Sequence, residues 1–220
     1  MKKIVIAIAF AMISFLGFAQ ENETVYFDAV TNIRIGYAGV VNTSEENLQG
    51  GVDFGFNLIE FGVRPYATGA ISLGVDFNLD SFHAADGYYF LTASHKTAIV
   101  PALNVFREVK RSRLEVINFG MPLNFTQTIG GKLAVTVGAT AKINLDSDTF
   151  VSYLSATEDY NSLYTSGVKT QRFGYDIHMA VTYENFGIYA SYSPMRLFEN
   201  GNGPDFNFFS VGLILRNFDD

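Results

Sequence analysis

Apolar residues occupy every second position in residues 132–145 (KLAVTVGATAKINL), from Leu133 to Leu145. The positions between them are small, polar or charged, and they include Lys132 and Lys142. A period of two is typical of a β-strand with two different faces. The pattern fits a surface strand of a soluble protein, and it fits equally a membrane barrel in which the apolar row faces lipid.

Seven other segments show the same alternation, so the chain is predicted to form eight strands. They cover residues 32–41, 52–66, 70–80, 113–128, 132–145, 171–184, 187–197 and 207–218. Near Leu58 the apolar residues change from one parity to the other, which predicts a β-bulge. Pro122 lies inside the fourth segment and removes a ladder hydrogen bond, so we expect a second local bulge there.

The connections between these segments alternate strictly between short and long. The short ones are residues 67–69, 130–131 and 185–186, and the long ones are residues 42–51, 81–112, 146–170 and 198–206. This order is typical of an all-β, up-and-down transmembrane β-barrel of eight antiparallel strands, with short periplasmic turns and long external loops. A ninth strand at residues 98–106 would break the alternation, so we interpret that apolar run as part of the second external loop, as a local hairpin.

Charged residues of both signs occur on the polar side of the predicted strands. An eight-stranded barrel is just wide enough to be filled by side chains, and isolated buried charges are costly. We therefore expect these residues to pair across a plugged lumen, with His178 as a further hydrogen-bonding residue: Arg34, Glu60, Arg64, Asp76, Lys132, Lys142, Asp176, Glu184 and Arg216. A soluble lipocalin-like barrel is the alternative, but its inner face would be apolar.

The N-terminus has the layout of a secretory signal peptide. Two lysines precede an apolar run over residues 4–16, and small residues follow at Gly17 and Ala19. We assign residues 1–20 to a cleaved signal peptide, residues 21–31 to an N-terminal lead and residues 32–220 to the barrel. The sequence contains no cysteine, which excludes a lipobox anchor and a disulfide framework.

The charge of the chain bears on its partners. A formal net charge of −7 argues against nucleic-acid binding, which depends on lysine and arginine. One basic run stands out in this acidic chain: Arg107, Lys110, Arg111 and Arg113. It is a candidate contact for lipopolysaccharide phosphates at the outer rim of the barrel, or simply the charged base of a loop. Outer-membrane lipid is the other expected partner.

Catalytic chemistry has little support in the sequence. His83 and His95 lie in the long second loop with Asp86 and Ser94, but their spacing matches no known catalytic motif. Gly130 and Gly131 lack the flanking residues of a phosphate loop, and no carboxylates have calcium-loop spacing. We therefore expect no enzymatic activity, no cofactor and no metal.

Two stretches resemble a known family. Residues 109–125 (VKRSRLEVINFGMPLNF) resemble the start of a central strand in the PorT-like outer-membrane β-barrel family of Bacteroidota, and residues 189–218 resemble that family's last hairpin. The resemblance spans essentially the whole mature chain and implies a small outer-membrane barrel. For some relatives it implies a role in export or envelope machinery. The chain departs from the usual aromatic end of such barrels, because Asp219 and Asp220 follow Phe218.

Three functions stay open at this point. The first is a non-enzymatic barrel that has a structural or binding role or that supports protein export or envelope assembly. The second is a narrow porin-like channel, and the third is a loop-borne lipid-modifying enzyme. The plugged lumen favours the first.

Overall fold

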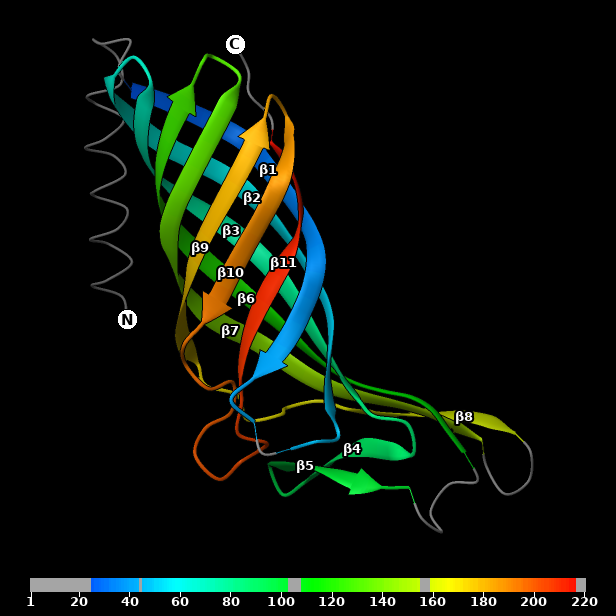
Figure 1. Cartoon of the computed structure of the whole chain (residues 1–220). Helices are drawn as coiled ribbons and strands as arrows, with labels where there is room; N and C mark the ends of the chain where they lie inside the picture. Colours follow the sequence, from blue (N-terminus) through cyan, green and yellow to red (C-terminus); the bar gives the residue numbers. More distant parts are fainter. Residues whose placement is uncertain (1–24, 44, 103–107, 155–158, 217–220) are drawn as a thin grey trace.

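The computed structural model describes residues 25–43, 45–102, 108–154 and 159–216, and these form a closed antiparallel β-barrel (Figure 1). Each wall strand pairs with the next one along the chain, and pairing of the first with the last closes the ring. The predicted eight-stranded, up-and-down architecture is therefore confirmed. The wall strands are β1 (Val25–Val41), β2 (Leu48–Tyr66), β3 (Gly69–Ala84), β6 (Glu108–Ile129), β7 (Leu133–Leu154), β9 (Phe173–Tyr183), β10 (Phe186–Ser193) and β11 (Asn207–Arg216).

The two ends of the barrel differ in their connections. The tight turns after β2, β6 and β9 lie together at the end drawn at the top of Figure 1, which we call the short-turn end. Gly130 and Gly131 form one of these turns with φ angles of 62° and 78°, a conformation that glycine adopts without strain. The long connections gather at the opposite, long-loop end.

The first strand begins earlier than the sequence predicts. β1 starts at Val25, inside the segment that we expected to be an N-terminal lead, and residues 25–29 pair with residues 59–63 of β2. The reason is that β2 continues to Tyr66 at the short-turn end, where its backbone needs a partner. The predicted signal peptide lies outside the described residues.

Of the two predicted bulges, one is present and one is not. The register between β2 and β3 shifts between Asn57 and Ile59, which confirms the bulge at Leu58. At Pro122 the prediction is wrong, because the pairing of β6 with β7 runs through this residue without a shift. The proline is accommodated by Gly74 on β3, where an added Cβ would lie 3.0 Å from the proline ring.

The long-loop end carries structure beyond the barrel. The outer parts of β6 (residues 108–116) and β7 (residues 147–154) pair with each other beyond the part of β7 that pairs with β9, and β8 (Tyr160–Thr165) pairs with residues 149–154 of β7. Residues 113–116 of β6 still pair with β3, and residues 108–112 continue past it. We call the outer parts of β6 and β7, together with β8, the extension; Figure 1 shows it projecting to one side of the barrel. The hairpin of β4 (Tyr88–Ala93) and β5 (Lys96–Pro101) lies beside it. The apolar run at residues 98–106 thus contributes to a hairpin as far as Pro101, and residues 103–107 lie outside the described part.

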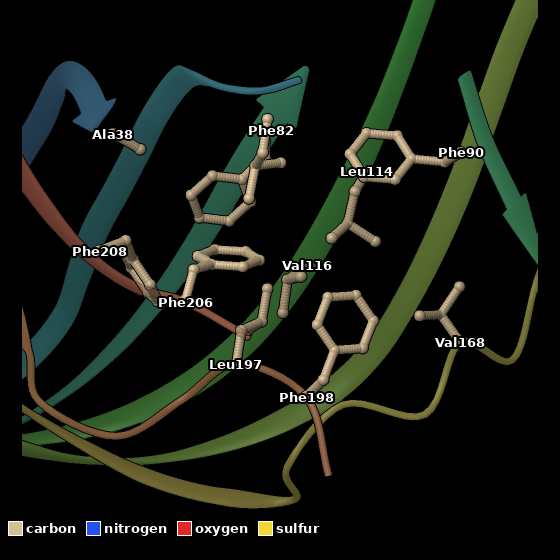
Figure 2. Close-up of a cluster of buried hydrophobic side chains, with 11 residues drawn as sticks. Ala38, Phe82, Phe90, Leu114, Val116, Val168, Leu197, Phe198, Phe206 and Phe208 are labelled. Carbon is tan, nitrogen blue, oxygen red and sulfur yellow. The ribbon is translucent and has the colours of Figure 1, made fainter. Parts of the chain in front are cut away.

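Apolar side chains lie on the outside of the barrel wall and inside the long-loop end. On the wall, outward apolar side chains of all eight strands are exposed; Ile35, Leu73, Ile177 and Leu213, for example, are 41 to 56% exposed. At the long-loop end, side chains from the strands and loops converge into a core that we call the apolar cap (Figure 2). Its buried members are Ala38, Leu48, Phe82, Phe90, Leu114, Val116, Val168, Leu197, Phe198, Phe206 and Phe208.

Candidate functional site

The lumen of the barrel is the most polar buried region of the described chain. Asn57, Glu60, Asp76, Asn118 and Lys142 are all buried although they are polar or charged. They point inward because they alternate with the outward apolar residues of the same strands. Burial of such groups is tolerated only where they are paired and hydrogen-bonded, so their contacts decide what the lumen can do.

The first lumen group links β1, β3 and β6. The guanidinium of Arg34 lies 3.0 Å from the carboxylate of Asp76 and also donates to the side-chain oxygen of Asn78 at 2.5 Å. Asn78 donates to Asn118 at 3.2 Å, and Asn118 donates to Asp80 at 3.0 Å. One arginine thus begins a chain of hydrogen bonds that crosses three strands.

The second lumen group lies next to the apolar cap. The ammonium of Lys142 lies 2.7 Å from Asp176 and donates to the hydroxyl of Ser193 at 2.9 Å. The Ser193 hydroxyl in turn donates to Asp176. The same ammonium lies 4.5 Å from the centre of the Phe208 ring, and Phe208 belongs to the cap. The polar lumen and the apolar cap therefore meet at Lys142.

The third lumen group links β1, β2, β7 and β11. Arg216 lies 3.6 Å from the carboxylate of Glu60 and donates to the hydroxyl of Thr136 at 3.1 Å. The phenol of Tyr26 donates to Glu60 at 3.3 Å. This group joins strands on opposite sides of the ring closure between β1 and β11.

Three of the nine residues that we expected in the lumen network lie elsewhere. Lys132 and Glu184 pair with each other at 2.6 Å, but their side chains are 60 and 56% exposed at the short-turn end. Their hydrogen bond raises the pKa of Lys132. Arg64 is also exposed, with its guanidinium 5.1 Å from the centre of the Tyr26 ring. These residues have the polar parity, but they lie beyond the enclosed part of the lumen.

Two buried carboxylates were missed. Asp53 and Asp80 lie directly opposite each other on β2 and β3, and both side chains are buried. The alternation could have identified both residues. Asp53 lies between Val52 and Phe54 and is therefore on the polar side of the strand before the bulge. Asp80 ends the third alternating segment on the same side as Asp76.

Little free space remains in the enclosed part of the lumen, although a hollow of about 650 Å³ opens at the short-turn end beside Lys132 and Glu184. His178 lies between Asn124 and Thr140, with nitrogen–oxygen distances of 2.7 and 3.3 Å. Two cavities, of about 40 and 20 Å³, both touch Arg34, His178 and Tyr189. Such volumes hold a few water molecules, which would satisfy buried polar atoms in the larger cavity. Those that lack a protein partner are Asn32 Oδ1, Arg34 Nε, Asn57 Oδ1 and Thr182 Oγ1.

The basic run is largely engaged with acidic neighbours. Lys110 lies 2.8 Å from Glu108, and Arg113 lies 3.0 Å from Glu115 and 5.0 Å from the centre of the Phe150 ring. Arg111 is exposed on the extension. Arg107 lies outside the described residues. The run is thus not a simple basic patch, because two of its three described members face a carboxylate.

The residues considered for catalysis do not form one constellation. His83 lies on β3 with Nδ1 3.4 Å from the carbonyl oxygen of Gly50. His95 and Ser94 form the turn between β4 and β5, and Asp86 lies in the exposed connection before β4. Within the described chain no hydrogen bond joins these four residues.

The chain matches no protein-family model and no curated protein. Among solved structures it is similar to Ail, the attachment invasion locus protein of Yersinia pestis, with 13% identity over 86% of this chain and 100% of that chain, and a TM-score of 0.36. Ail in complex with the heparin analogue sucrose octasulfate matches over the same shares at 13% identity, with a TM-score of 0.35. A mutant porin of Rh. blastica matches over 88% of this chain and 100% of that chain at 7% identity, with a TM-score of 0.21. The barrel assignment rests on the strand pairing and not on these similarities.

Among the described residues, no group of three or more histidine or acidic side chains has the geometry to hold a metal ion. No helix in the same residues is long and apolar enough to cross a membrane.

Proposed function

We propose that this chain is a small integral protein of the bacterial outer membrane, with a plugged lumen and a structural, binding or accessory role in the envelope. The observation that carries the proposal is the belt of exposed apolar side chains on all eight wall strands around a polar interior. Soluble monomers rarely expose an apolar surface of this extent. A closed barrel also satisfies the backbone of every wall strand, as hydrocarbon requires. The soluble lipocalin-like alternative lacks support, because the lumen carries ion pairs instead of an apolar lining.

The orientation follows from the connections. Barrels of this type keep short turns in the periplasm and long loops outside the cell, so the apolar cap and the extension would face the exterior. The resemblance of residues 109–125 and 189–218 favours a PorT-like protein of Bacteroidota, which suggests an accessory role in export or envelope assembly. We propose no catalytic role for the loop histidines. If His83 and His95 are both replaced, lipid A and phospholipid profiles should stay unchanged.

Lipopolysaccharide is the proposed lipid partner at the outer rim. Arg111 is the best candidate for a phosphate contact, because Lys110 and Arg113 already face Glu108 and Glu115. Arg111→Gln should then weaken binding to vesicles that contain lipopolysaccharide, while Lys96→Gln, on the β4–β5 hairpin, serves as a control for a lost external charge.

The experiment that tests the proposal is refolding of the mature protein from urea with and without detergent or phospholipid vesicles. A folded barrel should form only with detergent or lipid, and unheated samples should migrate differently from boiled ones in gel electrophoresis. A monodisperse folded monomer in plain buffer would contradict the proposal.

Planar bilayers separate the plugged barrel from the channel. Three ion-paired groups and the apolar cap fill the lumen, so the purified protein should give no conductance above background. Steady single-channel currents would instead favour a narrow channel.

A further inference from the structure

One edge of the extension is unpaired. β8 pairs with residues 149–154 of β7 through one edge, and within the described residues no strand pairs with its other edge. The opposite border of the extension is covered, because the β4–β5 hairpin lies against β6 and the Phe90 amide donates to the Ser112 hydroxyl at 2.9 Å. β8 therefore leaves a row of backbone donors and acceptors facing outward.

The sequence of β8 does not protect this edge. Natural edge strands are commonly shielded by lysine, proline or an inward-pointing charge, and β8 (YNSLYT) has none of these. Tyr160 and Tyr164 share one face of the strand and are 70 and 61% exposed, and Leu163 is exposed on the other face. Tyrosine and threonine favour extended backbone. The edge is thus uncharged and in a conformation suited to further pairing.

The edge is also held in place by its neighbours. The Tyr164 phenol donates to the carboxylate of Asp148 on β7, and this bond raises the pKa of Tyr164 to about 12. Tyr164 lies opposite Phe150, and the ring of Phe150 lies beneath the guanidinium of Arg113 on β6. Because three strands fix the edge before any ligand arrives, little ordering remains to oppose binding.

We propose that the free edge of β8 binds an extended, uncharged strand of a partner protein by β-strand addition. Alternating backbone N–H and C=O groups are matched by another extended backbone, and exposed side chains on both faces supply the contacts that select the sequence. The added strand would continue the ladder that already joins β6, β7 and β8. The inference rests on the proposed function, since the membrane must leave this edge in water.

The test uses a labelled peptide of residues 149–154 (TFVSYL), which is uncharged and already pairs with the inner edge of β8 in the chain. The full mature protein, folded in detergent, should bind this peptide saturably in a fluorescence anisotropy titration. Two further versions of the peptide carry N-methyl groups on every second residue, one at the odd positions and one at the even positions, so that each lacks the N–H donors of one edge. Their affinities should differ, and at least one should bind about tenfold or more weakly than the unmodified peptide. No saturable binding, or equal binding of all three peptides, would overturn the proposal.

Two β8 variants then locate the binding edge. Neighbouring residues of a strand point their N–H groups to opposite edges, so only one of Ser162→Pro and Leu163→Pro removes a donor from the free edge. One of the two variants should lose peptide binding while its gel mobility shift on heating persists, because β8 lies outside the barrel. Binding that survives in both variants would overturn the inference.

A second copy of the chain is the competing occupant of the edge. Ser162→Cys introduces the one thiol of a cysteine-free chain. A disulfide-linked dimer of this variant, together with failure of the unmodified protein to bind the peptide, would assign the edge to self-association and overturn the proposal. If refolding shows a soluble protein, the proposed function fails, and the same titration without detergent still decides whether the edge binds a strand.

Discussion

The barrel wall and the apolar cap place the same residue types on opposite sides of one strand. In the wall part of β6, leucine and phenylalanine point outward and asparagine and threonine point inward; in the outer part, the inward residues are Leu114 and Val116. Leu114 is 0% exposed and Leu123 is 55% exposed, although both lie on β6. Arg113 and Glu115 occupy the outward positions beside Leu114.

If the protein lies in the outer membrane as proposed, this difference marks where its surroundings change from lipid to water. Between Val116 and Ile117 the inward face of β6 changes from apolar to polar and the outward face changes from charged to apolar, although the strand is continuous. A strand in water buries its apolar face in a core, whereas a strand in a lipid bilayer directs it to hydrocarbon. We therefore place the outer boundary of the apolar belt at this point, with the cap and the extension beyond it.

The largest expected effect comes from breaking an ion pair in the lumen. Lys142→Met leaves the carboxylate of Asp176 without its cation in an enclosed site, so the free energy of unfolding should fall by about 3–5 kcal/mol. Urea titration of the protein in phospholipid vesicles measures the change. The double variant Lys142→Met with Asp176→Leu should recover most of the loss; no recovery would mean that the pairing across the lumen is not the cause.

Next in size is the removal of a side chain from the cap. Leu114→Ala should cost about 2–5 kcal/mol, because the buried site keeps a cavity. Leu123→Ala removes the same atoms from the same strand, but lipid tails fill the space, so the same urea titration should show a smaller loss. Equal losses would remove the distinction between the cap and the belt.

A charge in the belt should have a slightly smaller effect. Leu123→Lys places an ammonium on the lipid face and should destabilise the protein in vesicles by about 2–4 kcal/mol if the site lies near the bilayer midplane. Leu91→Lys on β4 is the matched control, since Leu91 is also exposed but lies on the external hairpin. If both lysines are tolerated equally well, the belt is not in contact with hydrocarbon.

The smallest effect is expected for the exposed pair at the short-turn end. Lys132→Met removes the partner of Glu184, but water already surrounds both groups, so the unfolding midpoint should not change measurably. The comparison with Lys142→Met is informative because the two lysines are ten positions apart and share one parity. A large loss for Lys132→Met would show that this pair is shielded in the membrane-embedded protein.

Several features of the fold could be predicted because they depend on neighbouring residues. Alternation with a period of two predicted the strands and the face of each strand that points inward. The change of parity at Leu58 predicted the bulge. The short and long connections gave the order of the strands. The expected bulge at Pro122 failed because the space for the proline ring comes from Gly74, a residue 48 positions earlier in the chain.

Which side chains face inward could be predicted from the pattern of residues, because the facing of a side chain depends on whether its position is odd or even along the strand. Which inward charges meet could not be predicted, because it depends on how the strands are arranged in the closed barrel. The tilt and register of the closed barrel bring Arg34 to Asp76 and Arg216 to Glu60, and they leave Lys132 and Glu184 in the open. The apolar cap could not be predicted for the same reason: its residues come from separate strands and loops, and they form a core only when the fold brings them together.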